Sequence, residues 1–260
     1  MHTPPPDVQA DTPLSEWVTA FEREGCLLIR QILDLEHLKA LRWRAQQAYA
    51  RADVLRGAGK LSPTEQVLDR YGHVPAEACY APHNPFLELV ELLAPCRPLL
   101  EALLPEPVLL YRVSLFRRQT AEGSPAAPLP WHQDSAFLGE LHPVLNCWSP
   151  LEPCDGTRPG LELLRQNLCT ALRPTAEAGD DYTRMALSET ELQTRFPTTP
   201  RWCPDMEPGD LLLFHEHMLH RTAWHPHLLK ARHSLEMRVT SASTAAARSS
   251  LLIPLHTPHG

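Results

Sequence analysis

A histidine and a carboxylate stand two residues apart in the segment Trp131-His132-Gln133-Asp134. The segment reads as part of a strand over 130–137, and residues i and i+2 of a strand point to the same side of a sheet. His132 and Asp134 would then direct an imidazole and a carboxylate to one point, which suits a metal ion. Because a His-x-Asp triplet often occurs by chance, the pair needs a third partner to be meaningful.

A histidine-rich block supplies candidates for that partner. It opens with the turn at 208–210, continues through an apolar strand and carries His215, His217 and His220, the last of them 88 residues after His132. One of these histidines, joined to the earlier pair, completes a face of two histidines and one carboxylate. Such a face leaves positions open for a co-substrate and dioxygen, and it is diagnostic of non-haem iron(II) oxygenases.

A possible carboxylate anchor follows twelve residues after His220, at Arg232. A strand arginine at that distance can lie behind a metal and hold a carboxylate through two parallel hydrogen bonds. Thr222 shares a strand face with His220 and can add a hydroxyl, while Trp148 can form a wall of the pocket. Arg238 shares the face of Arg232 and is its rival, as a substrate contact or a structural pair.

The elements that must position these side chains change character along the chain. Helices are predicted at 16–24, closed by Gly25, from Asp34 onward, and at 85–104, where Pro95 and Pro98 divide the helix; a strand is predicted at 26–30. The stretches 56–83 and 174–209 are predicted to be long loops, the first a possible active-site lid and the second holding a small helix at 188–194. Strands are predicted at 108–117, 130–137, 143–149, 160–165, 210–214, 217–223 and 233–240.

Helices first and strands later predict an α+β class, mainly β, and many short antiparallel strands usually close as a sandwich, jelly roll or barrel. The 27 prolines among 260 residues fit such short elements and argue against a long helical bundle. A net charge of −7 argues against nucleic-acid binding. No apolar run is long enough for a membrane span, and no secretory leader is evident. Seven cysteines without a CxxC pair indicate reduced thiols in a cytoplasmic protein.

Four segments in order, WHQD, NCWSPLEP, EPGDLLLFHEHMLHRT and RHSLEMRV, resemble the phytanoyl-CoA dioxygenase family. The resemblance covers roughly residues 108 to 240. It implies an oxygenase dependent on Fe(II), 2-oxoglutarate and O2, with a double-stranded β-helix (jelly-roll) core behind an N-terminal helical layer. The expected division is a single domain over 1–241, with helical support at 14–104, a core at 107–241 and a C-terminal tail at 242–260.

The resemblance also implies roles for particular residues. Iron ligands are expected at His132, Asp134 and His220, and Arg232, Thr222 and Trp148 are expected to hold 2-oxoglutarate. The expected reaction hydroxylates an unactivated C–H bond of a small organic molecule and releases succinate and CO2. A carboxylate ligand favours hydroxylation over halogenation, while desaturation, ring closure and epimerisation stay open.

Other functions remain open at this point. A jelly roll without 2-oxoglutarate chemistry, such as a zinc hydrolase or a cupin-like isomerase, would use His215, His217 and His220 as ligands. A non-catalytic binding module is a further alternative. Arg117 and Arg118 are expected to be solvated at a strand end, from which one could reach a substrate. The expected partner is a small molecule, with no nucleic acid and no membrane; the sequence leaves the oligomeric state open.

Overall fold

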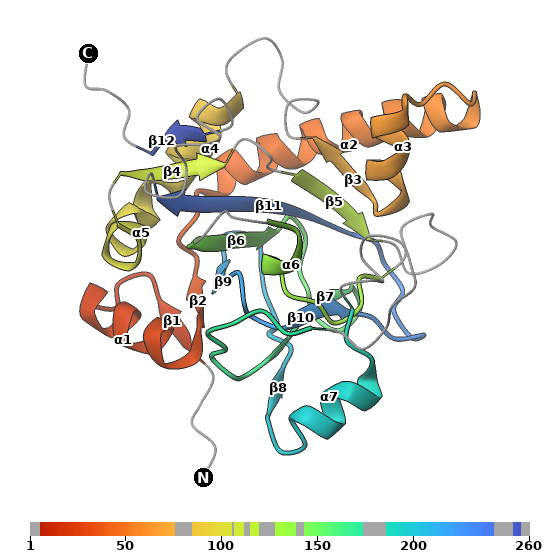
Figure 1. Ribbon diagram of the computed structural model, residues 1–260. Helices are drawn as coiled ribbons and strands as arrows, with labels where there is room; N and C mark the ends of the chain where they lie inside the picture. The colour runs from red at the N-terminus through yellow and green to blue at the C-terminus, as the bar shows by residue number, and fades with distance from the viewer. Residues whose placement is uncertain are drawn as a thin grey trace, which may run out of the picture.

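A computed structural model gives the fold of the chain (Figure 1). The structure describes residues 6–75, 85–105, 107–111, 115–119, 128–138, 143–173, 186–241 and 252–255. Within these residues no helix is both long and apolar enough to pass through a lipid bilayer.

Helices lie mainly in the first part of the chain and strands mainly in the rest. The helices are α1 (Leu14–Glu24), α2 (Leu35–Gly57), α3 (Pro63–Arg70), α4 (Pro85–Leu93), the 3-10 turn η2 (Ala94–Cys96), α5 (Arg97–Leu103), α6 (Ser135–Leu138) and α7 (Glu189–Arg195). The strands are β1 (Asp7–Gln9), β2 (Cys26–Arg30), β3 (His73–Pro75), β4 (Val108–Tyr111), β5 (Leu115–Gln119), β6 (Val144–Pro150), β7 (Gly160–Leu164), β8 (Arg201–Trp202), β9 (Leu211–His215), β10 (His220–Ala223), β11 (Arg232–Ser241) and β12 (Leu252–Pro254).

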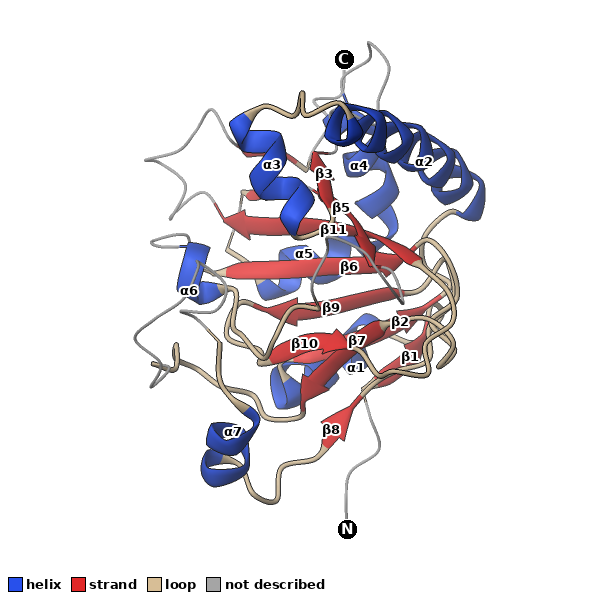
Figure 2. Cartoon of the chain, turned by 90° about the vertical axis from the view of Figure 1, so that its right-hand side faces the viewer, coloured by secondary structure: helices blue, strands red, loops and turns tan. Residues whose placement is uncertain are grey.

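Two sheets organise the molecule. The large one has the order β1-β2-β9-β6-β11-β4-β12, with β5 also paired to β11 and β3 paired to β5. The small one has the order β10-β7-β8. Figure 2 shows β10 and β7 in front of the large sheet and helices α1 and α5 behind it. The chain is therefore a mixed α+β fold built on a large sheet. Strand β12, from the segment expected to be a tail, pairs with β4.

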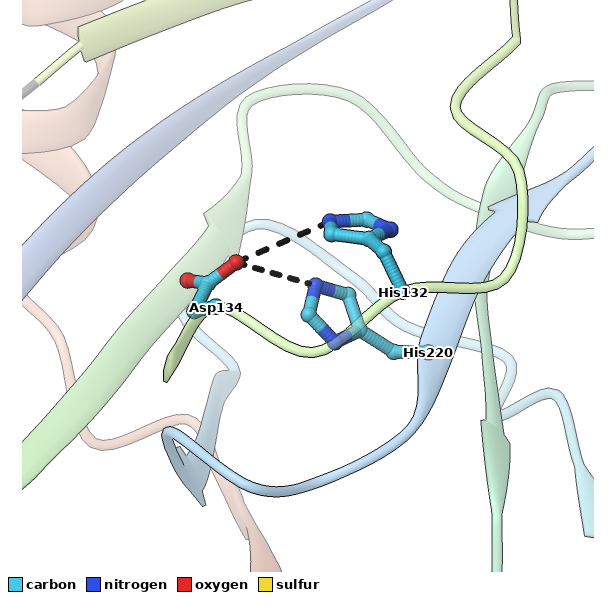
Figure 3. Close-up of side chains that lie close together, drawn as sticks. All are labelled: His132, Asp134 and His220. Atoms are coloured by element: carbon cyan, nitrogen blue, oxygen red, sulfur yellow. Dashed lines mark ion pairs between the residues drawn. The ribbon is translucent and has the colours of Figure 1, made fainter. Parts of the chain in front are cut away.

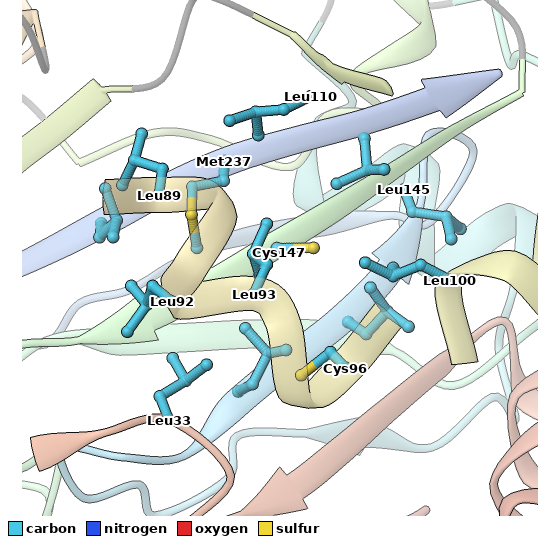
Figure 4. Close-up of a cluster of buried hydrophobic side chains, with 14 of the residues drawn as sticks. Leu33, Leu89, Leu92, Leu93, Cys96, Leu100, Leu110, Leu145, Cys147 and Met237 are labelled. Carbon is cyan, nitrogen blue, oxygen red and sulfur yellow. The ribbon is translucent and has the colours of Figure 1, made fainter. Parts of the chain in front are cut away.

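The two faces of the large sheet bury different side chains. The face toward the helices packs strand residues such as Leu145, Cys147 and Met237 against Leu93 and Leu100 of α4 and α5 (Figure 4). The opposite face, called here the inner face, packs a second apolar cluster between the two sheets. That cluster contains Cys26, Leu28, Trp148, Cys154, Leu161, Leu163, Met206, Leu212, Phe214 and Met218. Successive strand residues thus point alternately toward the helices, where they form the helical core, and into the space between the two sheets.

Several local predictions for the leading elements are confirmed. Gly25 ends α1 in a left-handed conformation with φ of 74°, and Asp34 caps α2 by accepting a hydrogen bond from the backbone N–H of His37. The predicted helix at 85–104 is divided at the prolines into α4, η2 and α5.

The prediction of a loop over 56–83 is wrong for the part that the structure describes. Residues 63–70 form α3, and residues 73–75 form the edge strand β3. The physical reason is a capping box: Ser62 and Glu65 satisfy each other's backbone N–H groups, and Pro63 begins the helix. Residues 76–83 lie outside the described residues, as do 174–185 of the second predicted loop.

The predicted strand over 130–137 is also wrong. Trp131 and His132 each make only an isolated bridge, to Leu187 and His220, and the chain then turns into α6. Asp134 sits in that turn, so the side-chain alternation of a strand is not what brings it to His132. The predicted strand over 108–117 is seen as β4 and β5, with 112–114 outside the described residues.

Candidate metal centre

Three predicted ligands converge between the two sheets (Figure 3). Asp134 Oδ1 lies 3.6 Å from His132 Nε2 and 3.8 Å from His220 Nε2. All three side chains are buried, and one ligand atom from each lies within 4.8 Å of the others. Among the residues that the structure describes, this is the only group of three or more such side chains with that spacing. The spacing suits a metal held by two imidazoles and one carboxylate.

Backbone contacts hold the segment that carries the first two of these residues. The backbone N–H and C=O groups of His132 bond to those of His220, at 3.0 and 3.1 Å. Between the two candidate ligands, the Gln133 amide donates to His217 O at 2.6 Å and accepts from Leu172 N at 2.6 Å. This short irregular segment is thus held at its first residue, His132, and at its middle residue, Gln133.

Both histidines present the same ring nitrogen to the centre. His132 Nδ1 lies 2.7 Å from Pro130 O, and His220 Nδ1 lies 3.0 Å from Met218 O. A carbonyl accepts a hydrogen bond, so Nδ1 carries the proton and the Nε2 lone pair is left for a metal. Burial, with the neighbouring His220, lowers the pKa of His132 to about 3, which keeps the imidazole neutral, as a metal ligand must be.

Arg238 holds the remaining oxygen of the candidate carboxylate ligand. Its Nη2 and Nε lie 3.1 and 3.3 Å from Asp134 Oδ2, on the side away from the two histidines. Burial by itself raises the pKa of Asp134, but Arg238 and the two histidines outweigh it and lower the pKa overall. The carboxylate is therefore ionised, with one oxygen toward the histidines and one toward the guanidinium.

The inner face of the large sheet carries donors that lack acceptors. Arg232 is fully buried, and its Nε, Nη1 and Nη2 make no hydrogen bond within the described residues. Trp148 Nε1, Asn146 Nδ2 and Ser234 Oγ are buried without a partner in the same way. The register of β11 on β6, which sets Glu236 opposite Trp148 and Arg238 opposite Asn146, places these residues on one face.

The predicted anchor residues are only partly brought together. The Arg232 guanidinium stacks 4.9 Å from the centre of the Trp148 ring. Thr222 instead meets Arg117: its Oγ1 accepts from Arg117 Nη1 at 2.9 Å and from Leu129 N at 3.0 Å. Because both bonds use the hydroxyl as an acceptor, its proton is left to donate elsewhere.

The expectation that Arg117 and Arg118 are solvated is wrong for Arg117. Arg117 is 1% exposed because β5 pairs with β11, which sets Arg117 opposite Ser234 on the inner face. Arg118 points to the other face and pairs with Asp53. No local sequence pattern predicts this difference, since it depends on the register between two strands far apart in the chain.

A cavity, called here the metal cavity, lies beside the three candidate ligands. Its lining includes His132, Asp134 and His220, with Trp148, Thr222 and Phe137 around them. The lining also includes the charged side chains Arg117, Arg221, Glu236 and Arg238. Arg232 is not among its lining residues and lies behind the Trp148 ring.

The rival histidines have other surroundings. His215 Nε2 lies 2.8 Å from Asn167 Oδ1, and its Nδ1 accepts from the backbone of His217 at 3.0 Å. His225 and His227 are exposed, as predicted for loop histidines. Within the described part of the chain, His215 and His217 do not join His220 in a three-ligand group, so nothing favours the zinc site proposed on them.

Comparison with known proteins gives a family and a fold. The model of the family described as phytanoyl-CoA dioxygenase (PhyH) matches residues 21–225. Among solved structures, the chain is similar to the epimerase SnoN in complex with Fe3+, alpha ketoglutarate and nogalamycin RO, with 18% identity, 88% of this chain and 84% of that chain covered, and a TM-score of 0.59. A second structure of the non-heme alpha ketoglutarate dependent epimerase SnoN, from nogalamycin biosynthesis, has 16% identity, coverage of 88% and 83%, and a TM-score of 0.55. No curated protein matches the chain.

Proposed function

Because the chain belongs to the phytanoyl-CoA dioxygenase family, we propose that it is an Fe(II)- and 2-oxoglutarate-dependent oxygenase that hydroxylates a small organic molecule. The proposed iron ligands are His132, Asp134 and His220. Their mutual spacing, their burial and the outward-facing Nδ1 protons fit a metal with open positions.

One observation carries the co-substrate part of this proposal: the guanidinium of Arg232 has no hydrogen-bond partner within the described part of the chain. A buried charge without a partner is costly, and proteins normally pair it or leave it exposed. Among the residues that the structure describes, the nearby donors Trp148 Nε1 and Ser234 Oγ also lack acceptors. A carboxylate has several acceptor sites and can therefore accept hydrogen bonds from such a group of donors. We assign this place to the carboxylate of 2-oxoglutarate that is remote from the metal.

The chain's own residues then have definite tasks. His132, Asp134 and His220 would hold the iron, and Arg232 would fix the far end of the co-substrate, with Thr222 free to donate its hydroxyl proton. Trp148 would separate that end from the open cavity and exclude water from it. When bound, the iron would let dioxygen oxidise both 2-oxoglutarate, which gives succinate and CO2, and a C–H bond of the substrate.

Further features support the same proposal. The facing large and small sheets, with helices α1 and α5 behind the large sheet, support a double-stranded β-helix core on an N-terminal helical layer, which we propose to form one domain over 1–241. A carboxylate at position 134 fits hydroxylation. SnoN is named an epimerase, so mass spectrometry of the products is needed to distinguish hydroxylation from epimerisation. A small-molecule substrate and a cytoplasmic location are part of the proposal.

The test is formation of succinate from 2-oxoglutarate with Fe(II) and oxygen across a panel of small organic molecules. The wild type should form succinate, and mass spectrometry of the products should show one added oxygen. His132→Ala should form none, whereas His225→Ala, which removes an exposed histidine, should match the wild type. Absence of succinate from the wild type, together with binding of Zn(II) but not of 2-oxoglutarate, would contradict the proposal.

A further inference from the structure

A cavity of about 230 Å³ lies at the edge of the large sheet, away from the candidate metal ligands. Its walls come from α2, α3, the connection between them and the edge strand β3, and they combine apolar side chains with the charged side chains of Arg51, Glu65 and Asp69. Ala52 and Leu55 line it from α2, Leu68 from α3, and Val74 and His73 from β3. The cavity is large enough to hold a small organic group rather than a single water molecule.

Helix α3 closes the outer side of this cavity with little packing of its own. None of its residues is buried, and Asp69 ties it to Arg56 of α2 by a hydrogen bond of 2.7 Å from Arg56 Nε. A second hollow, of about 360 Å³, lies beyond it and shares Leu61 and Asp69 with the cavity. The two hollows therefore border each other beside α2 and α3.

The inner end of the cavity meets the metal cavity at a pair of buried polar side chains. His73 is 4% exposed and lines the first cavity, and its Nε2 lies 3.5 Å from Glu236 Oε2, which is too long for a good hydrogen bond. Glu236 lines the metal cavity. On the neighbouring strand, Arg117 stands opposite His73 and also lines the metal cavity. The His73–Glu236 pair therefore lies at the junction of the two spaces.

We infer that the cavity between α2, α3 and β3 is a second compartment of the substrate site. It would take an apolar ring or branched group of the substrate while the reacting carbon lies in the metal cavity. The statement that the reacting carbon lies in the metal cavity rests on the proposed function, since it requires that the reaction takes place there.

Size and chemistry define the class of substrate. A cavity of about 150 Å³ with apolar walls suffices to bind benzene, so this one accepts a single substituted ring or a branched chain of similar bulk. The His73–Glu236 pair offers a donor and an acceptor at the junction of the two spaces. The substrate class is thus an apolar ring or branched chain bearing a hydroxyl or amine between that group and the carbon that reacts.

The test uses 4-iodophenol, which combines a ring, a hydroxyl and a strong anomalous scatterer. Soaked crystals of the wild type should show iodine between α2 and α3. Ala52→Phe fills the cavity and should weaken binding in solution at least tenfold, measured by titration calorimetry. Ala50→Phe introduces the same side chain on the exposed side of the same helix and should bind the probe as the wild type does. Iodine elsewhere, or equal binding by Ala52→Phe, would overturn the inference.

A second measurement joins the compartment to the metal. With Mn(II) in place of Fe(II), proton relaxation of the bound probe should be faster than in metal-free protein, and His132→Ala should abolish the enhancement. Binding in the compartment without enhancement in the wild type would refute its link to the reaction site. Failure of Mn(II) to bind the wild type would instead contradict the proposed function, while the crystal soak would still test the compartment.

Discussion

Replacing Arg232 with methionine should stabilise the ligand-free protein and remove its affinity for 2-oxoglutarate. The side chain is fully buried and its three nitrogens make no hydrogen bond within the described residues. Burial lowers its pKa, which reflects the cost of holding the charge there. Methionine keeps an unbranched stem and removes the charge. Exchange of buried ionic groups for apolar ones of similar volume gains about 1–4 kcal/mol in favourable cases, and each kcal/mol raises Tm by roughly 2–4 °C in a chain of this size.

The loss in binding follows from the same geometry. Removing one partner of a buried, hydrogen-bonded charge pair costs about 2–5 kcal/mol, which corresponds to roughly 30- to 5,000-fold weaker binding. Thermal unfolding of the metal-free protein gives the first quantity, and anaerobic calorimetry with 2-oxoglutarate gives the second. Arg30→Met serves as the control, because Arg30 has partners in Asp7 and Asp210. It should lower Tm and leave the affinity for 2-oxoglutarate unchanged.

The two measurements separate an anchor from a structural residue. A structural arginine would lower Tm on replacement and leave the co-substrate affinity as it was. That result for Arg232→Met would refute the assignment of the unpartnered guanidinium to a carboxylate. Arg232→Lys adds a further check, since a lysine keeps the charge but cannot form two parallel hydrogen bonds and should restore only part of the affinity.

Three further outcomes follow from the structure. Arg238→Met should weaken Co(II) binding about 10–100-fold in a calorimetric titration, because it frees the second oxygen of Asp134; unchanged affinity would show that Arg238 does not position that carboxylate. Burial, chiefly, lowers the pKa of His132 to about 3 and that of His215 to about 4. Between these values and 6.5 the unfolded chain binds more protons, so the free energy of unfolding in urea should fall as pH falls below about 6.5, by at most about 1.4 kcal/mol per pH unit for each histidine; a flat profile would contradict the buried neutral state. Gly25→Ala should lower the free energy of unfolding by more than about 1 kcal/mol, because φ is +74° and a Cβ would lie 2.4 Å from His215 Nε2; a Tm equal to that of the wild type would count against the close approach.

The identities of the candidate ligands were accessible from the sequence because they depend on residue type and order. His132 and Asp134 lie close in the chain, and His220 follows an apolar strand after a Pro-Gly-Asp turn. The backbone conformation that brings these three residues together could not be predicted from the sequence. The segment around His132 makes a single bridge to His220 and then turns into a helix, and this depends on a partner 88 residues away.

The same limit explains the residues that sequence reasoning missed. Alternation along one strand correctly placed Arg238 on the face of Arg232, because a period of two is a local property. Arg117 was expected to be exposed to solvent. That expectation was wrong because its burial depends on the pairing of β5 with β11, which is not a local property of the sequence. The capping box at Ser62 was a readable local signal for α3. The role of α3 as a cavity wall depends on long-range packing.

Strand β11 shows how the apolar core fixes the chemistry of the site. Its residues Leu235, Met237 and Val239 pack into the helical core, while the residues between them carry the charges of the inner face. A slip of one residue in its pairing would send the apolar side chains into the polar space and the charges into the core. The cost of that exchange locks the register. The register in turn sets Arg238 against Asp134, Glu236 against His73, and Arg232 beside Trp148. Substitutions of Leu235 or Val239 that loosen β11 should therefore impair metal and co-substrate binding together, although neither residue lines the metal cavity.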